Sequence, residues 1–238
     1  MRALVLGPTG VVGDAIVREG LQDTRIASLL AVSRRPLKHT SPRLETAVLA
    51  DFTDFRQLGD AIGRVDFVMC ALGISWYQAT NEAQYRLITH DYVMACARVA
   101  SIANPAIHFC FVSGHGAAAN GSQAWARIKA ETEHDLNAIF GSRLTVFRPG
   151  YIYPAHGREK PYWGDTLMRP LMPFQPTLAR WITDSTTVAR AVLHCGTGGT
   201  ISSPAGNREI AAAAADYDQA RAAANVAHGS ATRNPSTA

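Results

Sequence analysis

The stretch LVLGPTGVVG, residues 4–13, decides the fold of this chain. An apolar run ends at Gly7, and Gly10 and Gly13 follow at GxxGxxG spacing where an amphipathic helix opens. Glycines so placed allow a tight turn, close approach of the backbone to a pyrophosphate, and close packing of the helix on the strand. The free N–H groups at the start of that helix attract phosphate. We therefore predict a dinucleotide-binding loop made of Gly7, Thr9, Gly10, Val11, Val12 and Gly13.

Beyond this loop, short apolar runs alternate with helix-length amphipathic stretches, which is typical of repeated βαβ units. The expected strands are Arg2–Leu6, Ser28–Val32, Glu45–Ala50, Asp66–Ala71, Ile107–Val112 and Leu144–Phe147. The expected helices are Val11–Leu21, Phe55–Ile62, His90–Ile102, Ala124–Phe140 and Thr186–Cys195. We expect an α/β fold, a Rossmann doubly wound parallel sheet with helices on both faces.

The pattern changes after Pro149. Residues 151–181 carry six aromatic side chains among five prolines, which predicts a small substrate-facing cap in place of another βαβ unit. Residues 200–203 are a candidate short strand, and from Ala211 the chain is alanine-rich and then polar, which predicts a frayed helix and a disordered tail. We therefore expect one domain over residues 1–210 and a tail over 211–238.

Composition and charge exclude several classes of protein. The chain has 238 residues, of which 47% are apolar and 18% charged, as in globular proteins. The net charge of +4 comes from scattered Lys and Arg without a long basic run, so no nucleic-acid partner is expected. No apolar run approaches the roughly 20 residues of a membrane helix, so no membrane partner is expected. We expect a monomer or a homodimer.

The four cysteines show no metal-ligand spacing, and neither do the histidines, so we predict no metal site. Three of the cysteines lie in apolar segments, where free thiols are typical of a reducing compartment. This usage predicts a cytoplasmic protein.

The end of the second strand indicates which nucleotide binds. NAD sites place an Asp or Glu here to hold the ribose hydroxyls, whereas this chain reads Val32-Ser33-Arg34-Arg35. A hydroxyl and two guanidinium groups suit a 2′-phosphate, which Arg can bind with two hydrogen bonds. NADP is therefore predicted as the cofactor, with Ser33, Arg34 and Arg35 in the site. The alternative is a pair of solvated surface arginines.

The ordered motifs resemble those of a known family. The glycine loop is followed by Ser33-Arg34-Arg35, Asp51-Phe52, Ala71-Leu72-Gly73 and Arg148-Pro149-Gly150, after the second, third, fourth and sixth strands. Over roughly residues 1–195 the chain is similar to the atypical short-chain dehydrogenases of the NAD(P)-dependent epimerase/dehydratase group, in the branch of Tat-interacting-protein-like oxidoreductases.

The resemblance implies roles for these motifs. Asp51 and Phe52 would flank the adenine, although Asp51 also suits a helix cap. The run from Cys70 through Ala71 and Leu72 to Gly73 would lie beneath the ribose and pyrophosphate. Pro149 and Gly150 would lie beside the nicotinamide.

The catalytic motif departs from the family pattern. Members carry a Ser after the fifth strand and a Tyr-x-x-x-Lys on the next helix, where the Tyr moves the proton and the Lys binds the ribose. Here Ser113 and Lys129 are present, but Trp125 stands where the Tyr belongs. An indole N–H donates a hydrogen bond but is no general acid near neutral pH.

Three interpretations of this departure stay open. In the first, another group, His115 or Tyr151, supplies the proton. In the second, the reaction needs little acid catalysis, as in reduction of an activated alkene or quinone. In the third, redox chemistry is lost and the bound nucleotide is structural or sensed. Two hypotheses about function follow. The chain is an NADP-dependent oxidoreductase or related lyase or isomerase, or it is a non-redox NADP(H) sensor.

Aromatic side chains predict the character of the substrate. Trp76 and Tyr77 follow the fourth strand, and Tyr151 and Tyr153 follow the sixth, where they would line a pocket for a small apolar or aromatic molecule. The same residues would equally suit a hydrophobic core or a partner surface. Trp125 is either a stacking wall for substrate or plain packing.

Overall fold

The computed structural model describes residues 1–157, 178 and 180–231 of the chain. Its main sheet has six strands in the order β3-β2-β1-β4-β5-β6, all parallel. They are β1 (Arg2–Leu6), β2 (Ser28–Ser33), β3 (Leu44–Val48), β4 (Phe67–Cys70), β5 (His108–Val112) and β6 (Leu144–Phe147). This order is that of the doubly wound dinucleotide fold, so the predicted fold class is confirmed.

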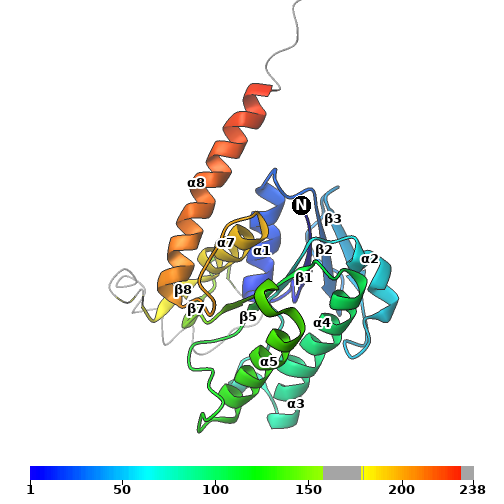
Figure 1. The fold of residues 1–238 in the computed structure, drawn as a ribbon, viewed down its shortest axis with the longest axis vertical. Coiled ribbons are helices and arrows are strands. Elements are labelled where there is room, and N and C mark those ends of the chain that lie inside the picture. The colour runs from blue at the N-terminus through cyan, green and yellow to red at the C-terminus, as the bar shows by residue number, and fades with distance from the viewer. Residues whose placement is uncertain (158–177, 179, 232–238) are drawn as a thin grey trace, which may run out of the picture.

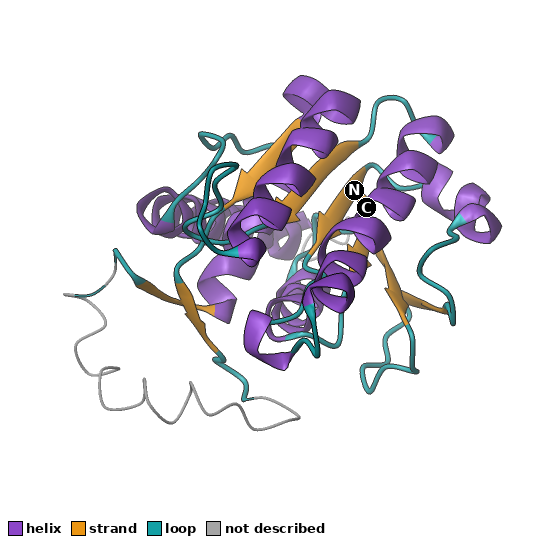
Figure 2. Ribbon diagram, turned by 90° about the horizontal axis from the view of Figure 1, so that it is seen from below, coloured by secondary structure: helices purple, strands orange, loops and turns teal. Residues whose placement is uncertain are grey.

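Helices cover both faces of this sheet (Figures 1 and 2). One layer holds α1 (Val11–Gln22), α7 (Ser185–Gly196) and α8 (Asn207–Ala231); the other holds α2 (Gly59–Gly63), α4 (Tyr92–Ala103) and α5 (Ala124–Phe140). Shorter turns are η1 (Arg56–Leu58), η2 (Trp76–Gln78), α3 (Glu82–Arg86), the π-helical η3 (Leu87–Asp91) and η4 (Gly141–Arg143).

Strand alternation divides the core into two parts. In β1, Leu4 and Leu6 pack under α2, α4 and α5, whereas Ala3 and Val5 pack under α1, α7 and α8. Successive side chains of a strand point to opposite faces, so a strand covered on both sides is apolar throughout. This is why the central strands are readable in the sequence as continuous apolar runs.

The segment after Pro149 differs from the expected cap in its described part. Two three-residue strands, β7 (Tyr151–Tyr153) and β8 (Ile182–Asp184), pair in parallel as a second small sheet. The remainder of the expected cap, with Tyr162, Trp163 and Phe174, lies outside the described residues.

The candidate strand at residues 200–203 is not formed. The chain instead returns along the outer edge of β6, where the Arg148 N–H donates to the Ala205 carbonyl at 2.7 Å and the Ala205 N–H donates to Val146 at 2.8 Å. Beyond this edge the Asn207 side chain accepts a hydrogen bond from the Gly150 N–H at 3.0 Å. We call residues 203–207 the return segment.

The alanine-rich region forms one helix, α8, which crosses the domain end expected at residue 210 and extends away from the body of the protein (Figure 1). Its first half is not frayed, because Ile210, Ala213 and Tyr217 are buried against the core. Arg221 then donates to the Glu19 carboxylate of α1 at 2.9 Å. Residues 232–238, the expected disordered tail, lie outside the described residues.

Within the described part of the chain, no helix is both long and apolar enough to cross a membrane.

Candidate functional site

The glycine loop between β1 and α1 is built for close approach. Gly7 has φ 84°, and a Cβ there would lie 2.9 Å from the backbone of Leu72. A Cβ on Gly13 would lie 2.0 Å from the Gly7 carbonyl oxygen, so the helix packs directly on the turn. A Cβ on Gly10 would meet only one atom, at 3.4 Å. Glycine at position 10 therefore keeps open space and is not required by the fold itself.

This open space is part of a cavity of about 880 Å³. Its walls come from the glycine loop, the loop after β2, the ends of β4 and β5, helix α5 and the segment after β7. No side chain caps the start of α1, so the first N–H groups of the helix are left for a ligand. Of the loop residues predicted to bind phosphate, Thr9, Gly10, Val11 and Val12 line the cavity.

The loop after β2 gives the cavity a cationic wall. Arg35 and Lys38 line it, whereas Arg34, which is equally exposed, is absent from its wall. Ser33 is buried and its hydroxyl donates to the Arg35 carbonyl, which shapes the turn. Among the described residues, no carboxylate pairs with the Arg35 guanidinium, so that charge is available to a ligand.

Two more basic side chains of this wall are paired. Arg18 and His39 each contact the Asp14 carboxylate at 2.6 Å. Burial opposes ionisation of Asp14, but its hydrogen bonds to Arg18 and His39 outweigh burial and lower its pKa. Sequence reasoning missed Arg18, Lys38 and His39, which carry no motif and reach the cavity only through the fold.

Asp51 and Phe52 lie outside the cavity wall. The Asp51 carboxylate accepts from the N–H and hydroxyl of Thr53, at 2.8 and 2.6 Å, within a turn; it does not cap the helix that follows, because η1 begins at Arg56 and has no side-chain cap. Phe52 is 3% exposed and packs edge-on against Phe55, with ring centroids 5.3 Å apart.

The end of β4 contributes backbone and small side chains. Ala71, Leu72 and Gly73, the run predicted to lie under the cofactor, line the cavity. Trp76 does not; its ring packs edge-on against the buried Tyr85 at 5.2 Å. Tyr77 is 72% exposed and is also absent from the wall.

Ser113 and Lys129 meet in the cavity wall, from β5 and α5. The Ser113 hydroxyl donates to the carboxylate of Glu133, a buried residue four positions beyond Lys129. Glu133 also accepts from the Nε of Arg148, at 3.0 and 3.1 Å. Glu133 was missed in the sequence, although its spacing from Lys129 puts both on one face of α5.

Lys129 lies in apolar surroundings. Its Nζ is 5.7 Å from the centroid of the Phe111 ring, and its aliphatic stem passes 3.4 Å from where a Cβ of Gly114 would be. Burial lowers the pKa of Lys129 to about 8, against the opposing attraction of Glu133 and Cys70. Burial also raises the pKa of the Cys70 thiol to about 12. This site therefore combines a lysine that is more easily deprotonated than usual with a thiol that stays protonated.

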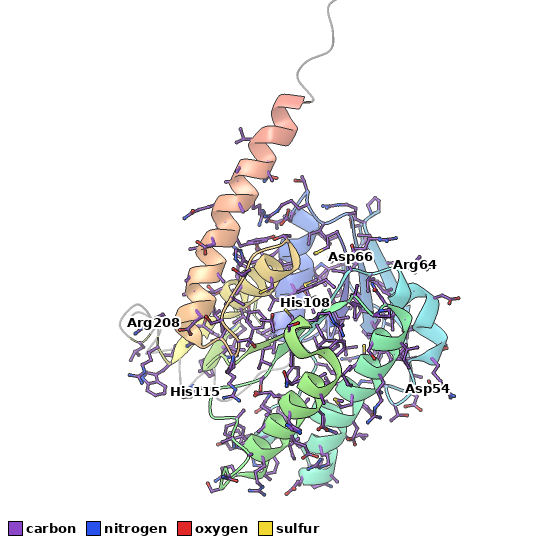
Figure 3. The ribbon with its side chains drawn as sticks, viewed as in Figure 1. Asp54, Arg64, Asp66, His108, His115 and Arg208 are labelled. Carbon is purple, nitrogen blue, oxygen red and sulfur yellow. The ribbon has the colours of Figure 1, made fainter. Side chains whose placement is uncertain are left out.

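The two alternative proton donors lie elsewhere. His115 is exposed beyond the end of β5, far from His108 near its start (Figure 3), and its ring meets that of Trp181 at 5.3 Å. Ile152 lines the cavity, so the alternation of β7 turns Tyr151 and Tyr153 to the other side of the strand.

Three further predicted residues lie outside the wall. The Trp125 indole reaches Gly116, where a Cβ would lie 3.2 Å from its ring. The Pro149 carbonyl accepts from the His115 N–H at 2.8 Å. A Cβ on Gly150 would lie 2.2 Å from the Trp181 carbonyl, so the β7–β8 pairing requires this glycine.

A separate surface cluster has the composition of a metal site, although none was predicted. Ligand atoms of His90, Glu131 and Asp135 lie within 4.8 Å of one another. Each already has a partner, because Arg86 binds Glu131 with two contacts of 2.7 Å and His90 contacts Asp135 at 3.0 Å. These pairings account for the cluster.

Comparison with known proteins identifies the family. The family model described as NAD dependent epimerase/dehydratase matches residues 3–140. The protein FMP52, mitochondrial, of Chaetomium globosum is 29% identical over 204 residues, covering 80% of this chain and 84% of that protein. The protein HTATIP2 of Rattus norvegicus is 26% identical over 194 residues, covering 80% and 78%. The family resemblance drawn from the motifs is thus confirmed.

Solved structures confirm the fold. The enzyme WbmF of Bordetella bronchiseptica in complex with NAD⁺ matches with a TM-score of 0.65 at 12% identity, covering 92% of this chain and 77% of that one. The UDP-glucuronic acid 4-epimerase of Bacillus cereus in complex with NAD matches with a TM-score of 0.64 at 12% identity, covering 84% and 76%. Both of those structures hold a nicotinamide dinucleotide.

The predicted cytoplasmic location is wrong by these comparisons. The FMP52 relatives of Chaetomium globosum and Eremothecium gossypii are both named as mitochondrial proteins. The prediction depended on free thiols, and free thiols distinguish a reducing from an oxidising compartment without identifying which reducing compartment it is.

Proposed function

The chain belongs to the NAD-dependent epimerase/dehydratase family, and on that premise we propose that it is an NADP(H)-dependent oxidoreductase acting on a small apolar or aromatic molecule. One observation carries the proposal. A single cavity joins the glycine loop and Arg35 at one end to Ser113 and Lys129 at the other.

The residues present fit a nicotinamide dinucleotide. The glycine loop leaves space that a Cβ at Gly10 would fill, and the start of α1 offers uncapped N–H groups to a pyrophosphate. Ala71 and Leu72 supply a flat floor of backbone and small side chains. Lys129 is within the same wall and has hydrogen atoms to donate to a ribose hydroxyl.

The cationic wall favours NADP over NAD. Arg35, unpaired among the described residues, and Lys38 line the end of the cavity next to β2, where a 2′-phosphate would lie. A charge-assisted pair with phosphate is worth roughly 1.5–3 kcal/mol, or about ten- to a hundredfold in affinity. Arg34 makes no contribution to this wall, so we assign the preference to Arg35.

Reduced cofactor bound there supplies a hydride, and the chain supplies the rest. Ser113 and Lys129 form the polar end of the site, and apolar side chains such as Val112 and Ile152 stand beside them. This apolar lining supports a small apolar or aromatic substrate. The aromatic residues predicted to line the pocket, with Trp125 first among them, do not form this wall among the described residues.

A second candidate is an NADP(H) sensor without redox chemistry. The observation in its favour is that no tyrosine lines the cavity among the described residues. The lysine in the wall argues for the enzyme, because a sensor needs no group that titrates near neutral pH.

A nucleotide-binding titration followed by a turnover assay tests the proposal. NADPH and NADH are titrated by nicotinamide fluorescence against wild type and Arg35→Ala, with Arg34→Ala as the matched control. We expect wild type and Arg34→Ala to prefer NADPH by about tenfold or more, and Arg35→Ala to lose the preference. Loss of NADPH absorbance with quinone, enone and aldehyde probes then separates the enzyme from the sensor. A wild type that binds neither nucleotide would refute both candidates.

A further inference from the structure

The hydroxyl hydrogen of Ser113 is already used in a hydrogen bond within the protein. A serine hydroxyl has one hydrogen, and in this structure it is donated to the Glu133 carboxylate. Glu133 is held by Arg148 through both carboxylate oxygens and is 8% exposed, so it has little freedom to release that hydrogen. Hydrogen bonds to a charged acceptor are about twice as strong as neutral ones. Ser113 therefore faces the cavity with its oxygen lone pairs, as an acceptor.

The other candidate donors do not reach the wall. His115, Trp125 and Tyr151 all lie outside it. Among the described side chains that line the cavity, His39 is paired with Asp14, which leaves Lys129 and His156 as candidate proton donors. The His156 imidazole is exposed, and its Nε2 lies 3.4 Å from the Thr186 hydroxyl.

The Lys129 amine is placed as a hydrogen-bond donor to a ligand in the cavity. Among the described residues, its Nζ donates no hydrogen bond and lies over the face of the Phe111 ring, 5.7 Å from the centroid. Its stem passes beside Gly114, where a Cβ would lie 3.4 Å from the Lys129 Cε. Its pKa, near 8, is the range in which a lysine works best as a general acid.

We infer that Lys129 donates the proton in the proposed reduction, and that Glu133 is a positioning residue which gives Lys129 this role by holding the hydrogen of Ser113. The inference rests on the proposed function. As a hydride passes from reduced nicotinamide to an electrophilic carbon, the oxygen of that carbon gains the electron pair of its π bond. The Nζ–H bond of Lys129 breaks and its proton goes to that oxygen. The neutral amine then regains a proton from water.

The first test measures Lys129 without any turnover. Competitive acetylation by acetic anhydride across pH, read at Lys129 by mass spectrometry, gives the pKa of this amine in the nucleotide-free protein. We expect an inflection near pH 8 in wild type. Glu133→Gln should move it to lower pH, because the carboxylate that favours the ammonium is removed. Glu131→Gln, two positions away on α5 and paired with Arg86, is the control and should leave it in place.

If Glu133→Gln does not fold, Glu133→Gln with Arg148→Met removes both charges and leaves no unpaired guanidinium. The same lower inflection is expected in the double variant. An inflection of wild-type Lys129 near that of an ordinary lysine, or one that neither Glu133 variant moves, overturns the inference.

The second test uses NADPH with 9,10-phenanthrenequinone as a probe dicarbonyl. Lys129→Arg keeps the charge and the hydrogen-bond donors but cannot give up a proton, so it should bind NADPH yet lose about a hundredfold or more in kcat. The wild-type kcat should fall above pH 8, and Glu133→Gln should shift this fall to lower pH with the Lys129 inflection.

The outcomes separate the two claims. Absence of NADPH binding by wild type refutes the proposed function and this inference with it. NADPH binding and probe reduction that survive in Lys129→Arg refute the inference alone. So does a loss of kcat in His156→Gln that matches the loss expected of Lys129→Arg, because His156 would then be the donor.

Discussion

Two glycines of the same loop should respond in opposite ways to the same substitution, Gly10→Ala and Gly13→Ala. At Gly13 the new Cβ would lie 2.0 Å from the Gly7 carbonyl oxygen, and the backbone on both sides is packed. Forcing a methyl group into such a contact costs about 1–3 kcal/mol. For a domain of this size that is a fall in Tm of roughly 2–12 °C.

At Gly10 the same methyl group meets one atom at 3.4 Å, and φ of −82° is open to any residue. The free energy of unfolding should therefore change by less than about 0.5 kcal/mol. The Cβ does enter the space in which the proposed phosphate would meet the start of α1. Loss of one charge-assisted hydrogen bond there, at roughly 1.5–3 kcal/mol, weakens NADPH binding about ten- to a hundredfold.

Thermal unfolding of both variants with and without NADPH is the assay. Gly13→Ala should unfold early in the absence of nucleotide, and Gly10→Ala should unfold like wild type but gain less Tm when NADPH is added. A Gly10→Ala protein that is destabilised without nucleotide, or one that binds NADPH like wild type, would refute the reasoning.

Three other outcomes are expected. Arg148→Met leaves the buried Glu133 carboxylate without its cation and should cost about 3 kcal/mol, seen as a Tm lower by roughly 6–12 °C; a change under 2 °C would contradict the pairing. Burial lowers the pKa of His90, but hydrogen bonds to Asp135 and Asp91 outweigh burial and raise this pKa. Protonated His90 therefore stabilises the fold below pH 6.5. This stabilisation is lost as the pH rises through the higher pKa of the folded state. Urea unfolding at about pH 6 and about pH 8.5 should show this fall in wild type, and a fall of equal size in His90→Gln would contradict it. Trp125→Tyr should change reduction of the probe dicarbonyl less than about twofold, because the indole lies outside the cavity wall; a rise of about a hundredfold would place the new phenol in the site.

The six-stranded sheet was predictable because its central strands are buried on both faces and so are apolar without interruption. The same logic missed β7 and β8, which are three residues long and therefore too short for any periodicity to show. The extra turn η3 before α4 was missed as well, because helical spacing does not distinguish a π-turn from an α-turn.

The proposed cofactor end of the site was more predictable than its proposed catalytic end. The glycine spacing and Arg35 can be read from the local sequence, and Gly10 and Arg35 both line the cavity. The direction of Tyr151 depends on which residue of β7 faces inward, and that is decided by its pairing with β8 some thirty positions later. The role of Glu133 depends on Arg148 and Ser113 meeting it from two other elements. Contacts between residues that are far apart in the chain cannot be predicted from the local sequence around either residue.

The return segment along β6 has a consequence for how the protein is made. A ribosome releases the chain from its N-terminus at about 5–20 residues per second, so all six strands of the main sheet emerge before residues 203–207 do. During that interval the N–H of Arg148 has only water where Ala205 will later accept from it. A strand edge left open in this way readily pairs with another chain. Newly synthesised protein therefore passes through a stage at which the glycine loop is complete but the outermost strand is unprotected, and only release of the C-terminal part ends it.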